Sequence, residues 1–115
     1  MVRIRTCGLV LAALMSFSTA VLAKAPQVNL QIKNHAFIPA EVTVPAGTRV
    51  KLLIHNADVT PAEFESYDLS REVVVPGGGN VVVFIGPLDA GHYGFFNDFY
   101  PSATGKVIVT APASK

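Results

Sequence analysis

The chain is poor in cysteine, and this scarcity limits how the protein can be stabilised. Its 115 residues include a single cysteine, Cys7, at the front of an apolar segment near the N-terminus. With only one thiol no intramolecular disulfide can form, so a hydrophobic core must stabilise the fold. Cys7 also lacks the run of apolar and small residues that a lipoprotein signal places before its cysteine. We therefore expect Cys7 to leave with that segment and the mature protein to contain no thiol.

The N-terminal segment, residues 1–23, predicts a secretory signal peptide rather than part of the fold. Two arginines give it a basic start, residues 7–23 are almost wholly apolar or small, and Ala23 offers a site for signal peptidase. An uncleaved anchor is the alternative, because about 17 apolar residues approach the shortest span of a bilayer. Ser16, Ser18 and Thr19 inside the apolar part favour removal. We expect an exported domain, residues 24–115, with no membrane span after cleavage.

A strong charge of either sign is also missing. Without the arginines of the signal peptide, seven Lys and Arg face eight Asp and Glu in the mature chain, which leaves it nearly neutral. A chain without a basic field has little attraction for nucleic acid, so nucleic acid is excluded as a partner. The mature chain is also too short for a second domain and shows no internal repeat.

Hydrophobic and polar residues alternate along most of the mature chain, which is typical of strands buried on one face. Short segments of this kind cover residues 28–32, 42–44, 50–54, 72–75, 81–85, 92–96 and 106–110, and another starts near Phe37. Seven or eight strands in so small a domain predict an all-β fold, a Greek-key β-sandwich. At most one short helical turn is expected, within residues 61–70 and starting near Pro61.

The order of the strands predicts which loops lie together. If the strand ending near Lys33 and the strand starting near Phe37 are antiparallel neighbours, the loop 34–36 lies at one end of the sandwich. Two strands later the chain returns to that end, so the loop 56–66 should share a rim with His35. Binding residues are often found on such loops, because a rigid scaffold positions them.

Four separated blocks of the chain resemble the framework of the cupredoxins. They are FIPAEVTVPAGTRV, NAD, GHYGF and GKVIV, which begin at Phe37, Asn56, Gly91 and Gly105. The resemblance implies a cupredoxin-like domain over residues 24–115. In that family copper is bound by a histidine after the Asn-x-Asp block and by Cys, His and Met in the loop before the last strand. These ligand positions hold Ala62, Asn97, Tyr100 and Ala103 here. Because the thiolate is missing, a blue copper centre is excluded.

A narrower resemblance is to small periplasmic cupredoxin-like proteins of the EfeO type, associated with high-affinity ferrous-iron uptake permeases. It is carried by the segments TPAEFES, RE, GPL and FFNDFY, which begin at Thr60, Arg71, Gly86 and Phe95. The resemblance implies a periplasmic location and, as partner, an iron permease or another periplasmic uptake component. Those relatives have a glutamate where this chain has Ala62 and a histidine where it has Tyr100.

The resemblance and the shared rim together predict an oxygen-rich, non-blue metal site. The candidate ligands are His35, Glu63, Glu65 and Asp98, with Tyr100 and Glu72 as secondary candidates. Such a site suits iron or manganese, and its imidazole would suit Cu(II), so the expected cofactor is an iron or copper ion. The two glutamates of the loop point the same way if the backbone is extended but diverge if it is helical. In a helical turn only one of the two glutamates would bind the metal, and the other would contact that ligand without reaching the metal.

Each candidate also has an ordinary structural interpretation, and two functions remain open. His35 would be a solvated turn residue, the two loop glutamates a solvated helix start, and Asp98 a turn cap. The leading hypothesis is an iron-binding protein of a ferrous-iron uptake system that assists Fe(II) oxidation without being an enzyme in its own right. The alternative is a metal-free interaction module that docks a permease or periplasmic partner through the same rim. The replacements at Ala62 and Tyr100 favour the alternative.

Overall fold

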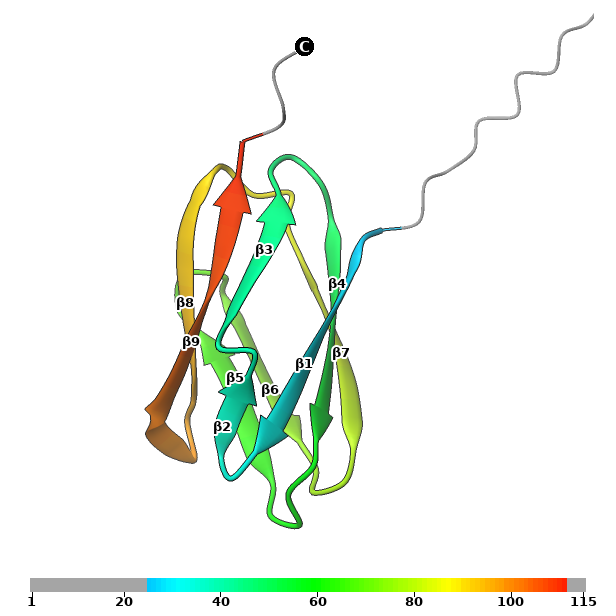
Figure 1. Ribbon diagram of the computed structural model, residues 1–115, viewed down its shortest axis with the longest axis vertical. Helices are drawn as coiled ribbons and strands as arrows, with labels where there is room; N and C mark the ends of the chain where they lie inside the picture. The colour runs from blue at the N-terminus through cyan, green and yellow to red at the C-terminus, as the bar shows by residue number, and fades with distance from the viewer. Residues whose placement is uncertain (1–24, 112–115) are drawn as a thin grey trace, which may run out of the picture.

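Residues 25–111, described by a computed structural model, form nine β-strands in two packed sheets (Figure 1). The strands are β1 (Gln27–Lys33), β2 (Ala36–Ile38), β3 (Glu41–Pro45), β4 (Val50–Asn56), β5 (Ala62–Ser66), β6 (Arg71–Val75), β7 (Asn80–Ile85), β8 (Gly91–Asn97) and β9 (Tyr100–Thr110). The expected signal peptide, with Cys7, lies outside the described residues. Among residues 25–111 no helix is long and apolar enough to cross a membrane.

The two sheets confirm the predicted β-sandwich. One sheet has the strand order β2-β1-β4-β7 and the other the order β3-β9-β8-β5-β6. Strand β1 is antiparallel to β2 but parallel to β4, and β3 is parallel to β9. Consecutive strands therefore cross between the sheets several times, which closes one core between two layers.

The core consists of the residues that alternate inward along each strand. In β4, Val50, Leu52 and Ile54 are buried while their neighbours are only partly covered. The rings of Phe37 and Phe95 meet edge to face with centroids 4.8 Å apart, and the ring of Phe64 lies 5.1 Å from that of Phe95. Each fully buried side chain of this size contributes about 1.5–3 kcal/mol, so these contacts stabilise a domain that has no disulfide within residues 25–111.

No helix forms within residues 61–70, where at most one short helical turn was expected, because that segment is strand β5 followed by a turn. Strand β5 lies inside the five-stranded sheet, with β6 on one side and β8 on the other. Its central residue Phe64 has no exposed surface, and a helical turn could not bury this ring and hydrogen-bond to both neighbouring strands. The additional strand raises the count to nine. It also leaves Glu63 and Glu65 on the same face, opposite Phe64.

The predicted shared rim is confirmed. The β1–β2 turn, the β4–β5 loop and the β8–β9 turn all lie at the lower end of the sandwich in Figure 1. The carboxylate of Asp58 accepts hydrogen bonds from the backbone N–H groups of Asn34 and His35, each at 2.8 Å. Both residues have positive φ, 52° and 67°. These two bonds are the main reason why the pKa of Asp58 is lowered.

Candidate metal centre

Three glutamates come together on the outer face of the five-stranded sheet. Glu65 of β5 pairs directly with Glu72 of β6, and Glu63 lies two residues along on the same face. One carboxylate oxygen of each lies within 4.8 Å of the others. Because oxygen ligands surround hard cations at about 2.0–2.6 Å, oxygens at this separation can share one cation. We call these three residues the carboxylate cluster.

Glu63 is the buried member of the carboxylate cluster. Only 7% of its surface is exposed, and its Oε1 atom has no hydrogen-bond partner among the described residues. A buried carboxylate oxygen without a partner is costly, and the group lowers this cost by binding a proton or a cation. The pKa of Glu63 is accordingly raised to about 7 by a hydrogen bond with Glu72, by burial, and by the charges of Glu72, Asp98 and Glu65.

Solvent exposure increases across the cluster from Glu63 through Glu65 to Glu72. Glu63 is buried, Glu65 is half-buried and Glu72 is exposed. Burial raises the pKa of Glu65 above its ordinary value, and the charges of Asp98 and Glu72 raise it further. A cation would therefore reach the cluster from the Glu72 side, and no Lys or Arg of residues 25–111 forms an ion pair with these carboxylates.

Asp98 lies next to the cluster but is not one of its three members. Its backbone N–H donates to the carbonyl oxygen of Glu63 at 2.9 Å, across the sheet end where β8 turns into β9. Its carboxylate is exposed, and its charge acts on both glutamates of β5. Asp98 therefore adds to the negative field at the cluster.

His35 and Tyr100 lie together at the rim rather than in the cluster. Their rings stack with centroids 4.6 Å apart and planes 15° from parallel. The imidazole is thus placed against a phenol ring, and His35 is not part of the group of carboxylates. His35 lies in the β1–β2 turn at the end of the sandwich, whereas Glu63 and Glu65 point outward from the sheet.

Asn97 occupies the position where the resemblance places a cysteine. Its side chain is fully buried, and its Oδ1 accepts hydrogen bonds from the backbone N–H groups of Glu63 and Phe99, both at 3.1 Å. Its Nδ2 donates to the carbonyl oxygen of His35 at 3.2 Å. A neutral amide therefore joins three segments at this point. Its neighbour Ala62 is also buried and carries no ligand atom.

Comparison with known proteins identifies relatives of this chain. A family model described as a cupredoxin-like domain matches residues 6–109. The uncharacterized protein RP394 of Rickettsia prowazekii (strain Madrid E) is 44% identical over 84 residues, which cover 72% of this chain and 67% of that protein.

Several solved structures share the fold. The metal binding domain of the Cu(I)-exporting P-type ATPase CopA of Streptococcus pneumoniae D39 has a TM-score of 0.66 at 15% identity, covering 73% of this chain and 84% of that one. Amicyanin from Paracoccus versutus has a TM-score of 0.59 at 23% identity, with coverage of 76% and 83%. A purple cupredoxin from Nitrosopumilus maritimus has a TM-score of 0.55 at 20% identity, with coverage of 72% and 99%. At these identities the likeness is one of fold.

Proposed function

This chain belongs to the family of cupredoxin-like domains, and on that basis we propose that it is a periplasmic iron-binding protein. In this proposal the metal is held by Glu63, Glu65 and Glu72 on the outer face of the five-stranded sheet. A blue copper centre is not part of the proposal. Residues 25–111 contain no cysteine, and such a centre needs a thiolate ligand. The copper chemistry named for some structural neighbours therefore does not transfer to the corresponding positions here.

The single observation that carries the proposal is the buried Oε1 atom of Glu63. Within residues 25–111 it has no hydrogen-bond partner, although it lies in a cluster of three carboxylates. Surface glutamates gathered by chance turn toward water, whereas this one is held against the sheet. A bound cation would give this oxygen the partner that the described residues do not supply.

The ligand chemistry favours iron over copper. The three members of the cluster offer only carboxylate oxygens, which suit hard or borderline cations. The imidazole that would suit Cu(II) belongs to His35, which stacks on Tyr100 outside the cluster. Anionic oxygens also stabilise Fe(III) more than Fe(II), so bound iron would be more easily oxidised. We regard this as an accessory effect of binding, and the protein as a metal carrier.

The proposed setting is a ferrous-iron uptake system. The predicted signal peptide supports export, and the resemblance to permease-associated periplasmic proteins supports an iron permease or another uptake component as the recipient. A carrier suits this role, because the cluster is open to solvent at Glu72 and can both accept and release a cation.

Anaerobic titration of the mature domain with Fe(II) tests the proposal. We expect one equivalent to bind with a dissociation constant below the millimolar range, and binding to weaken at least about tenfold in Glu63→Gln. Asp89→Asn is the matched control, because Asp89 is an exposed acid on the β7–β8 connection, away from β5 and β6. Absence of binding, or equal binding by both variants, would contradict the proposal and favour a metal-free interaction module. An intense blue band with Cu(II) would contradict the exclusion of a blue copper centre.

A further inference from the structure

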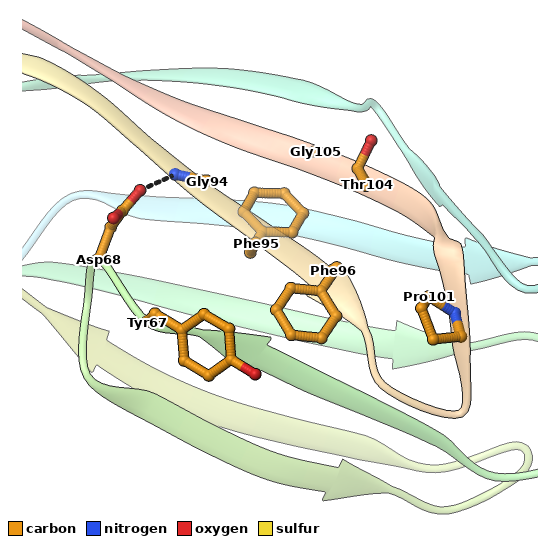
Figure 2. A pocket seen from close by; sticks show the side chains of 8 residues that line it. All are labelled: Tyr67, Asp68, Gly94, Phe95, Phe96, Pro101, Thr104 and Gly105. Carbon is orange, nitrogen blue, oxygen red and sulfur yellow. Dashed lines mark hydrogen bonds between the residues drawn. The ribbon is translucent and has the colours of Figure 1, made fainter.

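Two aromatic rings flank an open pocket on the same outer face as the carboxylate cluster (Figure 2). The rings of Tyr67 and Phe96 lie side by side, with centroids 5.4 Å apart and planes inclined by 55°. The pocket has a volume of about 350 Å³, and Asp68 lies at one edge and Pro101 at another. Tyr67 is 76% exposed. Most of this ring is therefore available for contact with a ligand.

The pocket adjoins the carboxylate cluster. Strand register places Glu72, Glu65 and Phe96 in one row across β6, β5 and β8. A second hollow of about 400 Å³, lined by Glu65 and Glu72, shares the Tyr67 side chain as a wall. Tyr67 therefore stands between an aromatic pocket and an acidic hollow, and one extended segment could contact both.

This face is strongly acidic. Six of the eight Asp and Glu residues of the chain lie on it or at its margin: Glu41, Glu63, Glu65, Asp68, Glu72 and Asp98. Two cations lie close to these carboxylates. Lys106 pairs with Glu41 at 3.4 Å, and Arg71, whose guanidinium donates to three backbone carbonyl oxygens, lies beside Glu65 and Glu72. Six carboxylates against these two cations still leave this face with an excess of acidic groups for a basic partner.

We propose that this face docks a basic segment of a partner protein and seats an arginine side chain against the rings of Tyr67 and Phe96 and beside Asp68. A planar guanidinium stacks on aromatic rings and binds a carboxylate at the same time, which a lysine ammonium does less well. Oδ2 of Asp68 accepts a hydrogen bond from the backbone N–H of Gly94 at 2.8 Å, so the carboxylate is held at the edge of the pocket. Its second oxygen makes no hydrogen bond to the described residues and can accept one from the guanidinium.

Docking at this face would also affect the carboxylate cluster. A basic segment lying across Tyr67 places positive charge beside Glu65 and Glu72, where it opposes a bound cation. Each ligand then weakens the other by the same factor, because coupling between two binding sites is reciprocal. Docking would promote release of the metal. This step rests on the proposed function, whereas the docking itself does not.

Fluorescence anisotropy of a labelled peptide of alternating arginine and glycine, titrated with the metal-free mature protein, tests the docking. Tyr67→Ser and Asp68→Asn should each weaken binding about tenfold. The side-chain oxygen of the asparagine can still accept the hydrogen bond from the backbone N–H of Gly94, so the fold is kept. A weaker affinity for the peptide then reports the loss of the negative charge. Tyr100→Ser is the control, because it removes an equally large exposed phenol from the rim and should leave the affinity unchanged. An equal loss in Tyr100→Ser, equal binding of a lysine peptide, or no binding by the unaltered protein would overturn the docking.

Repeating the titration with saturating Mn(II) tests the antagonism. The peptide should bind several-fold more weakly to the metal-loaded protein, and Glu63→Gln should abolish this difference. Peptide binding that persists while no metal binds would contradict the proposed function but support the docking. Metal binding without any effect on the peptide would overturn the antagonism alone.

Discussion

The side-chain carbonyl oxygen of Asn97 accepts a hydrogen bond from the backbone N–H of Glu63 at 3.1 Å. Both residues are buried, Asn97 completely and Glu63 to all but 7%. The bond connects the turn between β8 and β9 to the strand that carries the carboxylate cluster. The end of the sandwich and its outer face are therefore mechanically joined through one amide.

Replacement of Asn97 by alanine should destabilise the protein by about 2–4 kcal/mol. It leaves the backbone N–H groups of Glu63 and Phe99 and the carbonyl of His35 without their partner. Urea denaturation measures the loss. Asn29→Ala is the control, because that side chain is exposed and accepts only from Gln27. An equally small effect of both substitutions would show that the buried amide is not needed.

Replacement of Asn97 by cysteine should not create a blue copper centre. The substitution supplies a sulfur, but Ala62 and Ala103 have no ligand atom and Tyr100 offers only a phenol. A blue copper centre needs two imidazoles beside the thiolate. Absorption spectra after addition of Cu(II) should show no intense blue band, and the appearance of one would mean that His35 or another imidazole can reach the position.

The stability of the metal-free protein should fall as the pH rises through neutrality. The pKa of Glu63 is raised from 4.5 to about 7, so the folded state binds this proton more tightly than the unfolded state. Its stabilising effect is complete below the unfolded value and is lost as the pH rises through the folded value. Urea midpoints at about pH 5 and about pH 8 should differ in this direction. Glu63→Gln should reduce the difference between the two midpoints. If the difference is unchanged in this variant, groups other than Glu63 cause the pH dependence.

Metal should restore the stability that is lost at neutral pH. A ligand at 100 times its dissociation constant stabilises the folded state by about 2.7 kcal/mol, which raises Tm by about 10 °C or more in a domain of this size. Differential scanning calorimetry with Mn(II) measures the shift. A chelator should reverse it, and it should be much smaller in Glu63→Gln. A shift of the same size in this variant would place the cation elsewhere.

Gly105→Ala should destabilise the protein by about 1–3 kcal/mol. A Cβ at this position would overlap the ring of Phe95 and lie 2.6 Å from the carbonyl oxygen of Ala40. Gly94→Ala is a matched control in the neighbouring strand, where the added Cβ would lie at an ordinary 3.6 Å from Asp68 Oδ2. Thermal unfolding of both variants should show a loss only for Gly105→Ala.

The parts of the fold that follow from local patterns could be predicted from the sequence. Alternation in the segments now seen as β1, β4 and β7 reflects burial of one face. The shared rim followed from strand direction alone, and the contact of Asp58 with His35 bears it out. Strand β5 was missed, because Pro61 and two glutamates suggest a helix start while the pairing partners of β5 lie far away in the sequence.

All three glutamates of the carboxylate cluster were candidates from the sequence, Glu72 only as a secondary one. Glu63 and Glu65 could be singled out, but their arrangement depended on whether the segment was helical or extended. The importance of Glu72 depends on the register that sets it opposite Glu65, and register is a property of the folded sheet. The separation of His35 from the cluster is likewise a property of the fold, because His35 lies in the β1–β2 turn and stacks on Tyr100.

The alternation along β5 makes the two faces of this strand chemically independent. Ala62 and Phe64 face inward and Glu63 and Glu65 face outward, so a substitution on one side leaves the other side's ligands in place. A histidine introduced at position 62 would enter the sandwich end without displacing the carboxylates. A designer could therefore build a second, separately addressable metal centre on the same five residues and load the two with different ions.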